Sequence, residues 1–216
     1  MSIIDQRAAP PGAKPTDETK DIAVPSAAPW GNSAPLALAA FALTTFLLSM
    51  INAGFVDKGI EPVVFGMALT FGGLTQLIAG LFQFRTGNTF AGVLFSSFGA
   101  FWLSFWAIVT FFLADVPKDQ VGHAIGLYLI AWGIFSTWMW AASFRTSIVV
   151  NAALAVLAAT FFFLGAGNYS DTSGLVTTGG YLGLVVAAMA AYLSFAEVCE
   201  ASYHREVVPV GHLAKH

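Results

Sequence analysis

Uncharged polar side chains recur inside the long apolar runs of this sequence, and there they are the groups that could bind a polar solute. A hydroxyl or amide removed from water needs a partner from another segment, from trapped water or from a ligand. Gln76 is the clearest case, because its amide lies in the middle of a run. The set suits a small polar or anionic solute held by hydrogen bonds. It comprises Thr44, Thr45, Asn52, Gln76, Asn88, Thr89, Ser96, Ser97, Asn151 and Asn168.

Ionisable groups that would support other chemistry are rare in the same runs. No lysine lies within them, which excludes a retinal Schiff base, and His123 alone rules out paired-histidine haem ligation. Carboxylates do not cluster, so we expect no metal site, no cofactor and no enzyme. Glu197, at the end of the last run, is either a helix-end residue that reaches cytoplasmic water or a proton-linked, gating group at the inner mouth.

These polar groups must be positioned by helices that cross a bilayer. The chain has 216 residues, of which 57% are hydrophobic and 10% charged, against about 25% charged in soluble domains. Each apolar run exceeds the roughly 20 residues that a helix needs to span lipid, where the backbone must satisfy its own hydrogen bonds. We therefore predict an all-α integral membrane protein, a six-transmembrane-helix bundle over residues 31–203. The runs are 34–56, 62–84, 86–114, 120–144, 146–170 and 172–196.

The charged residues predict the topology. Residues 1–30 are rich in proline and lack hydrophobic periodicity, which indicates a disordered N-terminal tail; 204–216 form a second tail. Six spans put both tails on one side of the membrane, and seven of the nine basic residues lie on that side. We therefore expect a multi-pass plasma-membrane protein with both termini in the cytoplasm. The net charge of −3 and the lack of a basic stripe exclude a nucleic-acid partner.

Small residues repeat at steps of four along several runs, which places them on one helix face. Close packing of such faces drives helix association in lipid, either within the chain or between copies of it. The repeats are Gly92, Ser96, Ala100 and Ser104; Gly179, Gly183, Ala187 and Ala191; Gly122 and Gly126; and Gly72, Gly73 and Gly80.

The stretch NSAPLAL, residues 32–38, resembles the NPAPLGL signature of the acetate uptake transporter family, which includes bacterial succinate–acetate permeases and fungal ammonia–acetate exporters. Residues 71–104 are similar to the family's second and third helices, including its GNTF element, and residues 126–135 and 196–211 continue the register. Two signature positions differ, since Ser33 replaces proline and Ala37 replaces glycine.

The resemblance implies a six-helix protomer of a cyclic homo-hexamer, with a solute path through each protomer. It implies transport of acetate and related short monocarboxylates, with succinate as a further solute, by proton-coupled symport or as a passive channel. A non-transporting membrane scaffold or sensor remains the alternative. The family's constriction of Phe, Tyr and Leu corresponds to Phe41, Phe98 and Leu157, and Phe98 lacks the hydroxyl of the usual tyrosine.

The resemblance also makes the start of the first helix an inner mouth of this path. Asn32 suits an N-cap and Pro35 a first turn, and helix N-termini attract carboxylates, although ordinary capping explains the same residues. Thr44 and Thr45 follow Phe41 by three and four residues, so both fall near its face. The predicted substrate-binding set is Asn32, Pro35, Leu36, Thr44, Thr45, Gln76, Asn88, Thr89 and Ser97.

Overall fold

The computed structural model describes residues 30–211 and 213, and that part of the chain is almost entirely helical. It contains six helical segments long and apolar enough to cross a membrane, as the sequence predicts. The predicted N-terminal tail lies outside the described residues except for Trp30. The spans are Ala34–Asn52, Lys58–Arg85, Thr89–Asp115, Val121–Arg145, Ile148–Tyr169 and Ser173–Tyr203.

Several spans consist of more than one element. The first, fifth and sixth are single helices, α1 (Ala34–Asn52), α6 (Ile148–Tyr169) and α7 (Ser173–Tyr203). The second joins η1 (Lys58–Ile60), α2 (Glu61–Leu69), η2 (Thr70–Thr75) and α3 (Gln76–Arg85). The third joins α4 (Thr89–Ala107), η3 (Ile108–Phe112) and η4 (Leu113–Asp115), and the fourth joins α5 (Val121–Ala142) and η5 (Ser143–Arg145).

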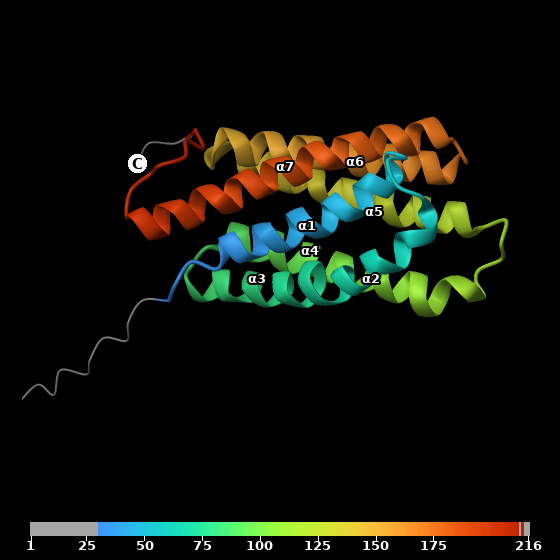
Figure 1. Cartoon of the computed structure of the whole chain (residues 1–216), viewed down its shortest axis with the longest axis horizontal. Helices are drawn as coiled ribbons and strands as arrows, with labels where there is room; N and C mark the ends of the chain where they lie inside the picture. The colour runs from blue at the N-terminus through green and yellow to red at the C-terminus, as the bar shows by residue number, and fades with distance from the viewer. Residues whose placement is uncertain (1–29, 212, 214–216) are drawn as a thin grey trace, which may run out of the picture.

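The helices lie side by side along the long axis of the molecule (Figure 1). The main packing pairs are α1 with α7, α5 with α6, α6 with α7, and α3 with α4. Figure 1 shows that α1 begins and α7 ends at the same end of the bundle, which we call the terminal end. The connections from α3 to α4 and from α5 to α6 lie at this end too, because six crossings return the chain to its starting side.

Small residues bring these helices together within the chain. A Cβ placed on Gly80 of α3 would lie 2.6 Å from Ser96 Oγ of α4, and one on Gly126 of α5 would lie 2.7 Å from the Gly165 carbonyl of α6. A Cβ on Gly72 would lie 2.7 Å from Thr44 Oγ1. At these positions the predicted repeats therefore serve packing inside one protomer.

The second span contains a π-helical turn, η2, where the sequence suggests a uniform helix. The Thr70 hydroxyl donates to the Gly66 carbonyl at 2.8 Å at its start. An inserted turn of this kind rotates the residues that follow it relative to those before, and such turns are frequent at functional sites. Gln76 is the first residue after η2, and its side chain is directed into the protein with 1% of its surface exposed.

The chain folds back onto the bundle after α7. His204 ends α7 in the left-handed conformation, with φ of 55°. The amide of Ile148 then donates to the carbonyl of Gly211 at 2.7 Å, and the amide of Leu213 donates to Thr146 at 3.0 Å. Tyr192 Oη donates to the Pro209 carbonyl at 2.6 Å. The predicted C-terminal tail is thus packed over the start of α6 as far as it is described.

Candidate solute pathway

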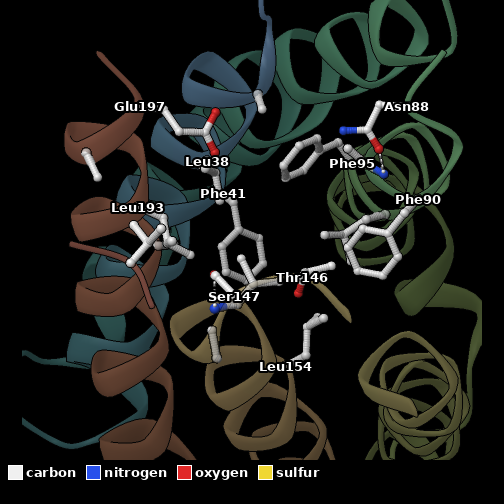
Figure 2. Close-up of a pocket in the computed structure, with 18 of the residues that line it drawn as sticks. Leu38, Phe41, Asn88, Phe90, Phe95, Thr146, Ser147, Leu154, Leu193 and Glu197 are labelled. Carbon is white, nitrogen blue, oxygen red and sulfur yellow. Dashed lines mark hydrogen bonds between the residues drawn. The ribbon is translucent and has the colours of Figure 1, made fainter. Parts of the chain in front are cut away.

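A cavity of about 460 Å³ lies between α1, α4, α6 and α7 at the terminal end of the bundle (Figure 2). Figure 2 shows Phe41 of α1 directed into this space, with Phe90 and Phe95 of α4 on one side and Leu193 and Glu197 of α7 on the other. The polar or charged residues of its lining are Asn32, Gln76, Asn88, Arg145, Thr146, Ser147, Glu197, Glu200 and Glu206.

A second, smaller cavity of about 110 Å³ lies deeper along the same bundle. Its lining extends to residues at the opposite end of the spans, Asn52 at the end of α1 and Glu61 at the start of α2. The other polar side chains of its lining are Thr45, Ser49, Thr160, Asn168 and the indole of Trp102. The two cavities together therefore extend from one end of the bundle toward the other.

Phe41 and Leu157 line both cavities, so they lie at the junction between them. Phe98 lines the large cavity, and the centre of its ring is 5.7 Å from that of Phe41. Phe98 is in turn stacked on Phe161 at 6.1 Å, with 5° between the ring planes. The exposed fractions of Phe41, Phe98 and Leu157 are 7%, 2% and 5%. The three predicted constriction residues thus come together from α1, α4 and α6.

Each cavity has at least one buried polar atom in its lining that lacks a partner in the described part of the protein. In the large cavity this atom is Gln76 Oε1. In the small cavity these atoms are Thr45 Oγ1 and Trp102 Nε1. Buried polar atoms are nearly always hydrogen-bonded, so these three indicate positions for water or a polar solute. Trp102 was missed in the sequence, although a buried indole N–H that needs a partner was a usable signal.

The start of α1 and the end of α7 are joined at the mouth of the large cavity. Asn32 Nδ2 donates to Glu197 Oε2 at 2.8 Å, and the amide of Ala34 donates to Asn32 Oδ1 at 3.0 Å. The N-cap position itself is occupied by Ser33, one residue later than predicted. Asn32 nevertheless bonds to the first turn, and the carbonyl of Pro35 accepts a hydrogen bond from Ser194 Oγ at 2.7 Å, which ties α1 to α7.

Asn88 has the capping role that was the alternative to solute binding. Its side chain accepts a hydrogen bond from the amide of Ala91 at 3.0 Å, which satisfies one free N–H group at the start of α4. Asn88 also lines the large cavity, so its NH2 group faces the same space (Figure 2).

Besides Pro35, four residues of the predicted substrate-binding set lie outside the lining of both cavities. Thr44 donates to the Ala40 carbonyl at 2.8 Å, is fully buried and packs against Gly72. Since Phe41 and Thr45 are four residues apart, they share the cavity face, whereas Thr44 is turned toward η2. Leu36 is 48% exposed, and Thr89 is also exposed. Ser97 is half-buried. We therefore leave all five out of the proposed path.

Six spans around two cavities that meet at apolar side chains define a small helical membrane-transport protein. The chain belongs to the GPR1/FUN34/yaaH family, whose model matches residues 16–215. This is a family of transporters rather than enzymes.

Three relatives illustrate the family. The chain is 41% identical over 174 residues to "Ammonia transport outward protein 2" of Saccharomyces cerevisiae, covering 78% of this chain and 62% of that protein. It is 33% identical over 183 residues to "Succinate-acetate/proton symporter SatP" of Escherichia coli strain K12, and the match covers 83% of this chain and 95% of that protein. It is 34% identical over 198 residues to "Acetate permease A" of Emericella nidulans, and the match covers 85% of this chain and 66% of that protein.

A solved structure supports the same assignment. The chain superposes on "Structure of the bacterial acetate channel SatP" with a TM-score of 0.79 and 31% sequence identity, covering 84% of this chain and 99% of that one. The all-helical fold with six candidate spans is therefore shared with that protein.

Proposed function

We propose that this protein moves acetate and related short monocarboxylates across the plasma membrane, through the two cavities and past the constriction of Phe41, Phe98 and Leu157. The main support is that Phe41 and Leu157 line both cavities and thus form the narrow place between them. The solute class comes from relatives named as an acetate permease and a succinate–acetate symporter. Succinate is a further candidate solute.

The unpaired polar atoms match the chemistry of a carboxylic acid on both sides of the constriction. Gln76 Oε1 is an acceptor, so it can bind the O–H of a protonated acid in the large cavity. Trp102 Nε1 and the Thr45 hydroxyl can donate hydrogen bonds, so they can bind carboxylate oxygens in the small cavity. Asn32 and Asn88 would guide the solute at the mouth.

The constriction would pass a neutral acid far more easily than an anion. Its three side chains are apolar, and no basic residue of the described chain lines the small cavity, so a bare carboxylate would lose its hydration without an opposite charge to replace it. Proton cotransport or passage of the protonated acid avoids this cost. We assign Glu197, at the mouth of the large cavity, as the proton-linked group. A passive channel with the same path is the alternative mechanism.

We place the terminal end of the bundle in the cytoplasm, because the basic residues of the two connections there are Arg85 and Arg145. We also propose that the protein assembles as a homo-hexamer, which the family resemblance implies. Native mass spectrometry of the detergent-solubilised protein tests this assembly; a monomeric mass would contradict it.

Uptake of labelled acetate into proteoliposomes, with and without an imposed pH gradient, tests the function. Protein-free liposomes give the rate at which acetic acid crosses the lipid alone. Symport predicts protein-dependent accumulation that collapses when a protonophore removes the gradient, and propionate, lactate and succinate should compete according to their fit. Flux that follows the electrochemical gradient of acetate would identify a channel. Uptake equal to that of protein-free liposomes would leave a scaffold or sensor and end the transport proposal.

A further inference from the structure

Aromatic rings surround Phe98, the constriction residue of α4, which is 2% exposed. The centre of its ring lies near those of four other rings, at 5.7 Å from Phe41, 5.9 Å from Trp132, 5.5 Å from Phe135 and 6.1 Å from Phe161. Aromatic pairs attract each other over roughly 4.5–7 Å between centres, so each of these contacts stabilises the position of the Phe98 ring. The four rings come from α1, α5 and α6, so three helices besides its own hold it.

Two of these rings, Trp132 and Phe135 of α5, lie behind Phe98, on the side away from the path. Neither residue lines the large or the small cavity, whereas Phe98 lines the large one. Their rings also contact each other, with 5.5 Å between centres and 81° between planes, an edge-to-face arrangement that stabilises both. This part of α5 therefore supports the wall of the path without touching the solute.

A hydrogen bond fixes α5 against α4 about one turn from these rings. Tyr128 Oη donates to the carbonyl of Phe101 at 2.9 Å. Trp132 follows Tyr128 by four residues on α5, and Phe101 follows Phe98 by three residues on α4, so both pairs lie on a shared helix face. The rings of Phe101 and Trp132 are also in contact, at 5.2 Å. The bond from Tyr128 therefore holds Trp132 in register with Phe98.

Phe161 supports Phe98 from α6 and extends the same wall beyond the constriction. The two rings are stacked, with 5° between their planes. Phe161 is 4% exposed and lines the small cavity, and it follows Leu157 by four residues, so both lie on one face of α6. The wall that Phe98 and Phe161 form thus continues from the large cavity into the small one.

Phe41 faces Phe98 across the constriction and has open space beside it. Of the ring contacts in the described part of the chain, Phe41 takes part in the one with Phe98. Figure 2 shows its ring directed into the large cavity, whose volume is about 460 Å³. A phenylalanine in a helix has more than one allowed χ1 rotamer, so its ring can move into such a space while the backbone stays in place. Rotation of Phe98, in contrast, would displace four neighbouring rings.

We propose that Phe98 is the fixed wall of the constriction and Phe41 the ring that moves, and that Trp132 and Phe135 are positioning residues that limit the size of the acid that can pass. The inference rests on the proposed function and adds to its path two residues that do not touch the solute. Because Phe98 is supported from behind, the path widens only by the displacement of Phe41. An opening of that size admits acetate and hinders acids with longer chains.

Phe135→Leu is the decisive variant, since it removes a ring behind Phe98 and leaves the lining of both cavities unchanged. Phe98 can then tilt into the vacated space, so the ratio of propionate to acetate uptake into proteoliposomes, each corrected for protein-free liposomes, should rise several-fold. In a Phe98→Ala background the same change should leave the ratio unaltered, because a positioning residue has no effect once the ring that it positions is gone. Phe163→Leu, the same change at an exposed site of α6, is the matched control and should keep the wild-type ratio.

Fluorine NMR measures the motion of the two rings without any transport. The protein is labelled at a low level with 4-fluorophenylalanine, and the signals of Phe41 and Phe98 are those that Phe41→Leu and Phe98→Leu remove. We expect relaxation dispersion to detect microsecond-to-millisecond exchange at Phe41 and none at Phe98. In the Phe135→Leu protein the Phe98 signal should show exchange as well, since its support has been removed.

An exchanging Phe98 signal in the wild type, or an uptake ratio that Phe135→Leu leaves unchanged, would overturn the proposal. An equal rise of the ratio in the Phe98→Ala background would do so too, because Phe135 would then act other than through Phe98. The expected signals in a protein that moves neither acid would support the fixed wall and refute the transport function. Size-exclusion chromatography checks that each variant is folded, and Trp132→Leu repeats the test from the second ring of α5 if Phe135→Leu is not.

Discussion

Replacing Leu157 with alanine should turn the dry junction between the two cavities into a wet one. Leu157 is 5% exposed and lines both cavities, so the three carbon atoms that the substitution removes lie at the narrow place itself. The space freed at the junction admits a water molecule, which occupies about 30 Å³ in the liquid. A continuous water path would then join the cavities.

The size of the effect follows from the hydrogen bond that this water can make. A crossing neutral acid that gains one hydrogen bond is stabilised by roughly 0.5–1.5 kcal/mol. Because about 1.4 kcal/mol of barrier is a factor of ten in rate, acetate flux should rise about two- to tenfold. Discrimination against propionate and lactate should fall, since the wider junction no longer excludes the larger solutes.

The assay compares initial rates of labelled acetate, propionate and lactate uptake into proteoliposomes. Leu154→Ala is the matched control, because Leu154 lies one turn away on α6 and is 4% exposed. Leu154 lines the large cavity but not the small one. Both variants should lose similar stability, about 2–5 kcal/mol for a buried leucine in a soluble core. If Leu157→Ala has the same rates and selectivity as Leu154→Ala, the junction is not the barrier and the reasoning is wrong.

Three further substitutions test other parts of the account. Phe98→Tyr adds the hydroxyl that the family resemblance implies at this position, and since a phenol O–H can donate to the second carboxyl group of succinate, we expect it to raise succinate uptake relative to acetate in a competition assay; an unchanged ratio would contradict a role for this hydroxyl. Gln76→Leu removes an unpaired acceptor from the large cavity, so the half-saturating acetate concentration should rise several-fold while the protein stays folded. Gly72→Ala places a methyl group 2.7 Å from Thr44 Oγ1 and should lower the melting temperature in detergent, whereas Gly174→Ala, with open space around it, should not.

The positions of the six spans follow from the sequence because charges interrupt the apolar runs at regular intervals. Lipid does not tolerate unsatisfied backbone, so each uninterrupted run had to become a helix. The sequence alone could not show which helix faces meet, and Phe41, Phe98 and Leu157 were grouped through the family resemblance.

The details that the sequence could not provide depend on helix rotation and on contacts between distant segments. Thr44 and Thr45 are adjacent and chemically identical, yet one packs against Gly72 and the other lines the small cavity. The π-helical turn that rotates Gln76 has no distinct residue pattern. The buried amide of Gln83 on α3 could not be paired with Asn32 from the sequence, because Asn32 lies 51 positions earlier in the chain, at a helix end that the fold brings to within 2.9 Å of it.

The most direct test of the central claim is to block the junction chemically. Cys199 is the single cysteine of the chain, so Leu157→Cys in a Cys199→Ala background carries one thiol at the narrow place. After mass spectrometry shows complete reaction with a small methanethiosulfonate reagent, labelled acetate uptake is measured in proteoliposomes. The account predicts that uptake falls to the rate of protein-free liposomes. Full uptake through the fully labelled protein would show that acetate crosses somewhere else.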